Sequence, residues 1–223
     1  MNGDQELWDW QFAIDILPML LAGLWVTVQA VVLGMLLAVT LGLLWEILRR
    51  SNSRFLAWPA IGVVEFVRST PLLIQLYFLY YVLPTVGLIF SPLFTGVIGL
   101  GLYYSSYTAE VYRAGINAVG HGQWEAAKAL NLNLLQTYHH VILPQAITPM
   151  IPVLGNYLIA MFKDTPLLSA ITIVEVLQQA KNIGSEEFRY LEPLTMVGLM
   201  YLFLSLLSGF WVGHLETRYR INR

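Results

Sequence analysis

Long apolar runs separated by short polar segments make up most of this chain. The first run, residues 16–45, contains no charged residue. It exceeds the roughly 20 apolar residues that a helix needs to cross a bilayer. Four further runs with few charges cover residues 55–83, 93–109, 145–162 and 193–215. This pattern predicts an all-α integral membrane protein with five transmembrane helices.

The basic residues beside these runs predict how the chain lies in the membrane. If residues 1–15 are extracytoplasmic and the tail 216–223 is cytoplasmic, residues 16–215 form one membrane domain. The cytoplasmic segments then hold eight basic residues: Arg49, Arg50, Arg54, Arg113, Lys128, Arg218, Arg220 and Arg223. The outer segments hold three: Lys163, Lys181 and Arg189. Because cytoplasmic loops carry an excess of Lys and Arg, we expect the N-terminus outside and the C-terminus in the cytoplasm.

The composition agrees with a membrane protein. Hydrophobic residues make up 57% of the chain and charged residues only 12%, against about 25% charged residues in a soluble domain. A formal net charge of −2 argues against a nucleic-acid partner. The chain has no cysteine, which excludes disulfides and thiolate metal ligands. Cysteine usage therefore does not indicate whether the chain faces a reducing or an oxidising compartment. The acidic start of the chain is unlike a signal peptide, so we expect the first run to be a retained span.

The polar segment 120–144 interrupts the apolar runs and has apolar residues at helical spacing. It predicts two short amphipathic helices with a break at Asn131, because Asn tolerates the left-handed conformation well. Gly122 is the expected N-cap, which puts Glu125 in the first turn, where the helix dipole favours a carboxylate. Pro144 suits the first turn of the next helix. Such a hairpin is either a docking surface for a partner protein or a loop on the lipid headgroups.

Charged side chains within the second apolar run are candidates for function. Arg68 lies near the middle of this run, where a charge costs roughly 2.5–3.5 kcal/mol on insertion scales. Glu65 lies one helical turn earlier and is a suitable partner. The pair either fixes the packing of helices or belongs to a polar path through the membrane.

A short sequence repeat favours a polar path. Arg68-Ser69-Thr70-Pro71-Leu72-Leu73 recurs as Lys163-Asp164-Thr165-Pro166-Leu167-Leu168, each at a proline in an apolar segment. Proline opens a helix locally, and paired helix breaks indicate the solute path of a transporter. The predicted path residues are Glu65, Arg68, Thr70, Tyr107, Glu110, Lys163, Asp164 and Thr165. The alternative for the tyrosines is ordinary aromatic packing.

Two sequence blocks in segment 120–144 resemble the EAA signature of ABC importer permeases. Glu125-Ala126-Ala127 is followed at the family's spacing by Asn131 and by Val141-x-Leu143-Pro144. Asn131 and Val141 replace the family's Gly and Ile. The resemblance implies a type I ABC importer permease fold in which this loop is a cytoplasmic coupling hairpin that contacts an ATPase. The implied contact residues are Gln123, Glu125, Ala126, Ala127, Asn131, Leu143 and Pro144.

The two Thr-Pro-Leu-Leu blocks and Tyr112-Arg113-Ala114-Gly115-Ile116 resemble the polar amino acid branch of these permeases. Within that branch, stretches such as GNYLIAMFKDTPLLSAIT are most similar to ectoine and hydroxyectoine permeases. The resemblance implies uptake of a small zwitterion, ectoine or hydroxyectoine, through a bacterial inner membrane. The alternative solute is a polar amino acid such as arginine, glutamine, glutamate or histidine.

The same resemblance implies the partners. They are a second permease subunit, identical or different, two cytoplasmic ATPase subunits, an extracytoplasmic substrate-binding protein and the lipid bilayer. We expect no cofactor in this chain, because it has no Gly-rich phosphate loop with Lys, and ATP and Mg belong to the ATPase.

Two other classes of protein compete with this interpretation. An intramembrane enzyme needs a nucleophile and a base within the membrane. The four histidines, His121, His139, His140 and His214, lie at or beyond the cytoplasmic ends of the predicted spans and form no metal pattern. An ion-driven carrier is the third class, but it would leave the coupling loop without a partner. We therefore expect a transport subunit without catalytic or metal-binding residues.

Overall fold

The computed structural model describes residues 7–220, and all regular structure in that part of the chain is helical. The helices are α1 (Trp10–Arg49), α2 (Arg54–Ser69), α3 (Leu72–Tyr77), α4 (Pro92–Asn117), α5 (His121–Ala129), α6 (Leu134–Thr137), α7 (Leu143–Asp164), α8 (Val176–Glu187) and α9 (Leu191–Arg220). Short π-helical segments (Phe78–Val82, Tyr138–Ile142) and 3-10 helices (Leu83–Val86, Thr165–Ile171) join several of them. The all-α prediction is confirmed.

The first apolar run forms a single helix, α1, that extends beyond the predicted span at both ends. Asp9 caps its start, because the Asp9 carboxylate accepts a hydrogen bond from the Phe12 backbone N–H at 3.0 Å. Residues 10–15 are therefore helical and belong to α1, although the sequence predicted them as part of a separate outer segment. At the other end α1 continues to Arg49, which places this arginine on the helix itself.

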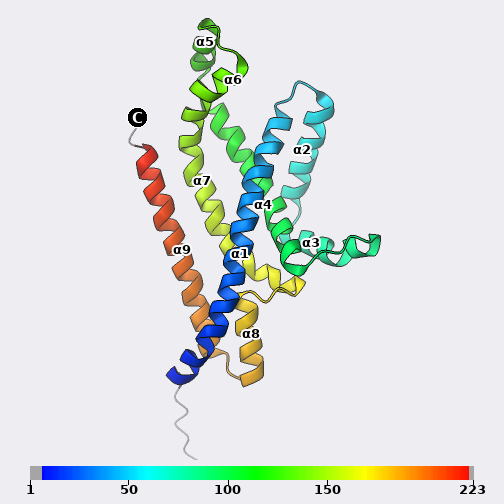
Figure 1. Cartoon of the computed structure of the whole chain (residues 1–223), viewed down its shortest axis with the longest axis vertical. Helices are drawn as coiled ribbons and strands as arrows, with labels where there is room; N and C mark the ends of the chain where they lie inside the picture. The colour runs from blue at the N-terminus through cyan, green and yellow to red at the C-terminus, as the bar shows by residue number, and fades with distance from the viewer. Residues whose placement is uncertain (1–6, 221–223) are drawn as a thin grey trace, which may run out of the picture.

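Close contact between α1 and α4 holds the centre of the molecule together (Figure 1). Gly42 lies against α4 so tightly that a Cβ atom there would be 2.0 Å from Thr108 Oγ1. Small residues allow such close approach of helices in lipid. Thr108 in turn donates a hydrogen bond to the Ala38 carbonyl at 2.8 Å. This contact brings the charged residues near the ends of both helices together.

The second apolar run was predicted as one transmembrane helix, but the structure shows two helical segments at a sharp angle. After α2, Thr70 is extended (φ −111°, ψ 137°), and the helical segment Leu72–Val86 continues at 107° to α2. Pro71 accounts for the break, because it lacks a backbone N–H and disfavours a helical conformation in the preceding residue. The Gln75 amide donates hydrogen bonds to the Val67 carbonyl at 2.8 Å and the Thr70 carbonyl at 3.1 Å. The side chain thus stabilises the end of α2.

Three helical stretches of residues 7–220 are long and apolar enough to cross a membrane: Trp10–Arg49, Leu134–Ile171 and Leu191–Leu215. The bent pair of α2 and Leu72–Val86 gives a fourth if it is one span. α4 has 26 residues but is not among these stretches, because glycines, tyrosines, serines and threonines lower its mean hydropathy. The count of five transmembrane helices therefore stays a prediction.

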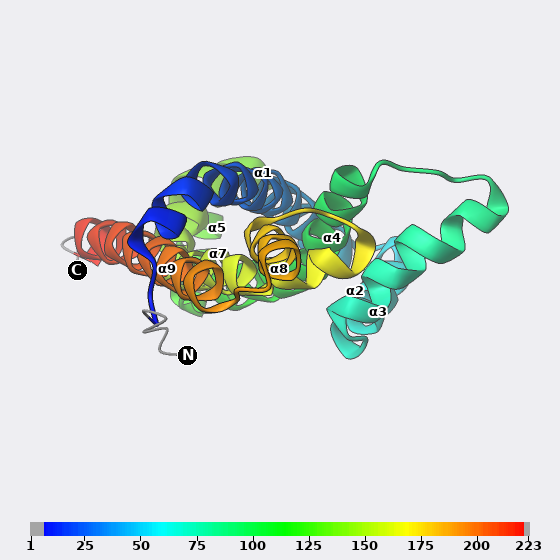
Figure 2. The same ribbon diagram turned by 90° about the horizontal axis from the view of Figure 1, so that it is seen from below.

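The helices place the polar segments at opposite ends of the molecule. The start of α1 and α8 lie at one end, whereas α5, α6, the α1–α2 link and the last part of α9 lie at the other (Figure 1). Seen from below, α3 and the turns after it reach away from the remaining helices (Figure 2). Two hydrogen bonds connect this arm to the end of the 3-10 helix Thr165–Ile171. One joins the Tyr80 hydroxyl to Thr172 Oγ1 at 2.9 Å, and in the other the Tyr81 hydroxyl donates to the Ala170 carbonyl at 3.2 Å.

Candidate functional site

The polar segment 120–144 begins with α5, which starts earlier than predicted. Its N-cap is Gly120 and not the predicted Gly122. The prediction missed the position because a glycine can cap a helix at either place, and the sequence alone does not distinguish the two. Glu125 consequently lies beyond the first turn, so the predicted interaction with the helix dipole is wrong. Instead, the side chain is 72% exposed and its Oε1 lies 3.2 Å from His121 Nδ1.

The predicted break between the two short helices at Asn131 is confirmed, two residues after α5 ends at Ala129. Asn131 has φ 60°, in the left-handed region. Its N–H donates a hydrogen bond to the Lys128 carbonyl at 3.0 Å, and the Leu132 N–H donates to the Ala127 carbonyl at 3.1 Å. These two bonds form a Schellman motif, which satisfies the last carbonyls of the helix.

The second predicted amphipathic helix, α6, is short and continuous with the next span. Its start is fixed by a capping box: Asn133 Oδ1 accepts a hydrogen bond from the Gln136 N–H, and Gln136 Oε1 accepts one from the Asn133 N–H. A π-helical segment then leads directly into α7, so one helical stretch covers Leu134–Ile171. Leu143 and Pro144 lie in the first turn of α7, as expected for a proline at a helix start.

The coupling hairpin, residues 120–144, packs against the membrane domain with one face only. Trp124 and Tyr138 pack onto a buried cluster that includes Ile116 on α4 and Ala146 on α7, and Ala127 is buried. The exposed residues include five of the seven predicted contact residues and several leucines: Gln123, Glu125, Ala126, Asn131, Pro144, Leu130, Leu134 and Leu135. The other two predicted contact residues are not exposed, because Ala127 is buried against the membrane domain and Leu143 is half-buried. Exposed large apolar residues beside polar ones are typical of a surface that binds another protein.

A second group of predicted residues gathers around Glu110 on α4. Its carboxylate lies 2.7 Å from Arg49 on α1, 3.5 Å from Arg68 on α2 and 3.6 Å from Arg113 on α4. Arg68 also lies 3.8 Å from Glu65, the pair predicted from sequence. Both Arg68 (36% exposed) and Glu65 (57% exposed) remain open in this chain, so they are not a buried pair. Glu110 therefore links three helices through one carboxylate.

Tyrosines on α4 connect this charged group to the second Thr-Pro repeat. The Arg68 guanidinium lies 6.0 Å from the ring centroid of Tyr107, which is within cation–π range. The Tyr107 hydroxyl donates to the Tyr103 hydroxyl at 3.0 Å, and the Tyr104 hydroxyl donates to Asp164 Oδ2 at 2.7 Å. A row of polar and aromatic contacts thus runs along α4 from Arg68 to Asp164.

The two Thr-Pro repeats differ in conformation. Thr70 is extended at a sharp break, whereas Thr165 stays helical (φ −58°, ψ −29°) at the start of a 3-10 helix. Thr165 is buried, donates to the Phe162 carbonyl at 2.8 Å and lies 3.0 Å from the Tyr201 hydroxyl. Lys163 is exposed, and among residues 7–220 its side chain forms no ion pair or hydrogen bond with the row along α4. Of the second repeat, only Asp164 joins the row.

Two elements of this site were not predicted. Arg49 was counted only as a basic residue beside a span, yet it makes the shortest contact with Glu110, 61 positions away. Glu175 was not considered, yet its buried carboxylate accepts hydrogen bonds from the Gln178 N–H at 2.7 Å and the Tyr201 hydroxyl at 2.9 Å. The contacts of Arg49 with Glu110 and of Glu175 with Tyr201 have no local signal in a single sequence, because the partners come from distant segments.

Comparison with known proteins gives consistent matches over nearly the whole chain. Residues 30–221 match a family model described as binding-protein-dependent transport system inner membrane component. A probable amino-acid ABC transporter permease protein, y4tG of Sinorhizobium fredii, is 55% identical over 93% of this chain and 89% of its own length. The arginine transport system permease protein ArtQ of Bacillus subtilis is 32% identical over 96% of this chain and 98% of its own.

A solved structure agrees with these matches. It is described as a crystal structure of an amino acid ABC transporter with histidines, and it superposes with a TM-score of 0.89. The superposition covers 95% of this chain and 99% of that chain at 32% sequence identity.

Proposed function

The chain belongs to the family of binding-protein-dependent transport system inner membrane components and is a permease subunit of an ABC amino-acid importer, and we propose that it carries a polar amino acid along the row of residues on α4. It is a transport subunit rather than an enzyme. A permease of this type works with an ATPase and a substrate-binding protein. The fold is that of a type I ABC importer permease.

The coupling hairpin is the proposed contact with the ATPase. Its exposed face combines Glu125 with the three exposed leucines Leu130, Leu134 and Leu135, at the end of the molecule that also holds the α1–α2 link with its arginines. The excess of basic residues at that end supports a cytoplasmic position for the hairpin and an outside position for the N-terminus. We expect two ATPase subunits, with their ATP and Mg, and a second permease subunit, identical or different.

The single observation that carries the proposed path is the row from Arg68 through Tyr107 and Tyr104 to Asp164. It offers the groups that a polar amino acid needs: a guanidinium for its carboxylate, carboxylates for its ammonium group and aromatic faces for a cationic side chain. Since Arg68 and Glu110 already contact each other, an incoming solute exchanges partners with an existing ion pair and need not find a free charge. The row would face the second permease subunit across the passage.

The solute is better supported as a polar amino acid than as ectoine. The matched relatives and the solved structure are described by amino-acid transport, and one of them by arginine transport. Nothing in these descriptions refers to ectoine. The residues along α4 would accept either zwitterion, so the similarity to amino-acid permeases decides between the two.

The experiment that tests this proposal measures the ATPase activity of the assembled transporter in lipid vesicles. Its substrate-binding protein is supplied empty or loaded with arginine, histidine, glutamine or ectoine in turn. We expect stimulation by at least one amino acid and little by ectoine. Stimulation by ectoine alone would overturn the choice of solute, while stimulation by none of the four would overturn the polar amino acid proposal as a whole. A complex with Asp164→Asn should bind the loaded protein normally but respond less.

A further inference from the structure

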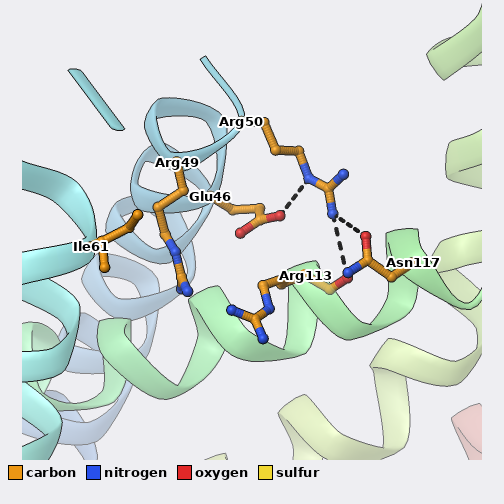
Figure 3. A pocket seen from close by; sticks show the side chains of 6 residues that line it. All are labelled: Glu46, Arg49, Arg50, Ile61, Arg113 and Asn117. Atoms are coloured by element: carbon orange, nitrogen blue, oxygen red, sulfur yellow. Dashed lines mark hydrogen bonds and ion pairs between the residues drawn. The ribbon is translucent and has the colours of Figure 1, made fainter. Parts of the chain in front are cut away.

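A cavity of about 360 Å³ lies between α1, α2 and α4, close to the end of the molecule that carries the coupling hairpin (Figure 3). Its walls are formed by Glu46, Arg49, Arg50, Ile61, Arg113 and Asn117. Small-ligand pockets in proteins usually measure about 300–1,000 Å³, so this cavity has room for a small ligand. The proposed solute path does not account for it, because the cavity lies beyond Glu110 from the tyrosine row.

The cavity is basic, and its arginines are held in place by other residues. Arg50 forms an ion pair with Glu46 and donates to Asn117 Oδ1 at 2.7 Å. Figure 3 shows the guanidinium groups of Arg49 and Arg113 on the other side of the Glu46 carboxylate. The Arg113 side chain is 52% exposed, and its contact with Glu110 is long, at 3.6 Å. Arg113 is therefore the arginine most available to a ligand.

The charges around the cavity and Glu110 form two ion-paired groups, which together leave one positive charge uncompensated. Ion-pair contacts link four arginines around the cavity and Glu110 to three carboxylates: Arg49, Arg50, Arg68 and Arg113 with Glu46, Glu65 and Glu110. A ligand with a single negative charge would balance this group. A phosphodiester carries one such charge and is a good acceptor for guanidinium groups.

Glu46 adds a second requirement for the ligand. Its side chain is 2% exposed, Oε1 pairs with Arg50, and Oε2 is buried without a hydrogen-bond partner among residues 7–220. A buried carboxylate oxygen without a donor costs free energy, so the site favours a ligand that brings one. The ligand that fits both observations has a hydroxyl group near its phosphodiester.

Apolar side chains beside the cavity show where the rest of such a ligand would lie. Ile61 lines the cavity and is 41% exposed, and Trp58, three residues earlier on the same face of α2, is 69% exposed. An exposed tryptophan next to arginines at the end of a span is typical of the headgroup region of a membrane. The cavity therefore opens beside a surface suited to the headgroup region of a membrane.

We propose that this cavity binds the headgroup of an anionic phospholipid of the inner leaflet. Its phosphodiester contacts Arg113 and Arg49, a headgroup hydroxyl donates to Glu46, and its glycerol backbone lies beside Ile61 and Trp58. Basic pockets between transmembrane helices on the cytoplasmic side are suited to anionic lipid headgroups on general electrostatic grounds. Because Arg49 and Arg113 also contact Glu110, the bound lipid adjoins the charged end of the solute path.

The test measures lipid binding to the purified transporter complex after lipid removal in detergent, by native mass spectrometry and by thermal unfolding. The probes are phosphatidylglycerol, phosphatidylcholine with the same acyl chains, and soluble glycerol 3-phosphate. Phosphatidylcholine has the phosphodiester but no hydrogen-bond donor in its headgroup. We expect phosphatidylglycerol to bind and stabilise, and the other two to have much smaller effects.

Three variants connect this binding to the cavity. Arg113→Gln removes the available charge, and Ile61→Trp fills the cavity without changing charge. We expect each to weaken phosphatidylglycerol binding at least about fivefold, whereas Arg54→Gln, which removes an exposed arginine outside the cavity at the same end, should bind like the wild type. Equal binding of both lipids, equal stabilisation by glycerol 3-phosphate, or unchanged binding in both cavity variants would each overturn the proposal.

Discussion

The hydroxyl group of Tyr104 on α4 donates a hydrogen bond of 2.7 Å to the carboxylate of Asp164, the last residue of α7. Tyr104 is 3% exposed, so the bond lies mostly away from solvent. It joins the second Thr-Pro repeat to the helix that carries Tyr107 and Glu110. The position of Asp164 thus depends on α4 as well as on its own helix.

Tyr104→Phe removes this donor while keeping the aromatic ring. Because a hydrogen bond to a charged group is worth about 1.5–3 kcal/mol, and 1.4 kcal/mol corresponds to tenfold, we expect uptake to fall about tenfold. The amount of assembled complex should be unchanged. Tyr112→Phe is the matched control, because Tyr112 donates to the Val39 carbonyl on α1 and lies outside the proposed path. Equal effects of both variants on uptake would remove Tyr104 from the path.

Arg68→Gln should lower uptake far more than it lowers the stability of the complex. The ion pairs of Arg68 are partly exposed, and such pairs contribute only about 0–1 kcal/mol to stability. A role in solute passage therefore predicts a loss of transport at a normal level of protein. Uptake assays with quantified membrane levels of the complex check this.

The double variant Glu65→Gln with Arg68→Gln separates passage from packing. If Arg68 only neutralises Glu65, the double variant regains transport, because no uncompensated charge remains in that pair. Glu110 keeps Arg49 and Arg113 as partners in either case. We expect uptake to stay low, and wild-type uptake would leave Arg68 with a structural role only.

Glu125→Lys reverses a charge on the exposed face of the coupling hairpin. The side chain is 72% exposed and makes no long-range contact among residues 7–220, so the fold should be unaffected. We expect ATPase co-purification and coupled transport to be lost. Glu186→Lys on α8 makes the same reversal at the other end of the molecule and should leave co-purification intact. Normal coupling in Glu125→Lys would disprove the docking role of this face.

Asn131→Gly should be tolerated and Asn131→Val should not. Asn131 has φ 60°, where a β-branched side chain is strained by about 1–3 kcal/mol and glycine is not. The measurement is thermal stability together with ATPase co-purification, and the valine variant should lose both. Similar behaviour of the two variants would show that the hairpin does not depend on this turn.

Features with a strong local cause could be predicted from the sequence. The charge-free run of α1 and the turn at Asn131 follow from side-chain chemistry over a few residues, and the structure has both. The N-cap of α5 was placed two residues late because Gly120 and Gly122 have equal capping properties. Pro71 was predicted to interrupt the helix, but the 107° angle between the two segments was not predicted. A proline indicates where a helix ends, but it does not determine the direction of the following segment.

Contacts between distant segments could not be predicted. Arg49 meets Glu110 because Gly42 and Thr108 bring α1 and α4 together, and one sequence contains no record of which helices are neighbours. The repeat correctly indicated a helix break at Pro71, but the break predicted at Pro166 was wrong, because Thr165 continues the helix whereas Thr70 is extended. The path residues themselves stay predictions.

The continuous helical stretch Leu134–Ile171 joins α6 of the coupling hairpin rigidly to the second Thr-Pro repeat. At 1.5 Å per residue, a straight helix of this length measures roughly 57 Å. α6 lies at one end and Asp164 near the other, so no flexible loop absorbs a displacement between them. A tilt of about 10° around the middle would move each end by about 5 Å, in opposite directions. This helical stretch can bend at three places, which are the π-helical segment Tyr138–Ile142, Pro149 and Pro152.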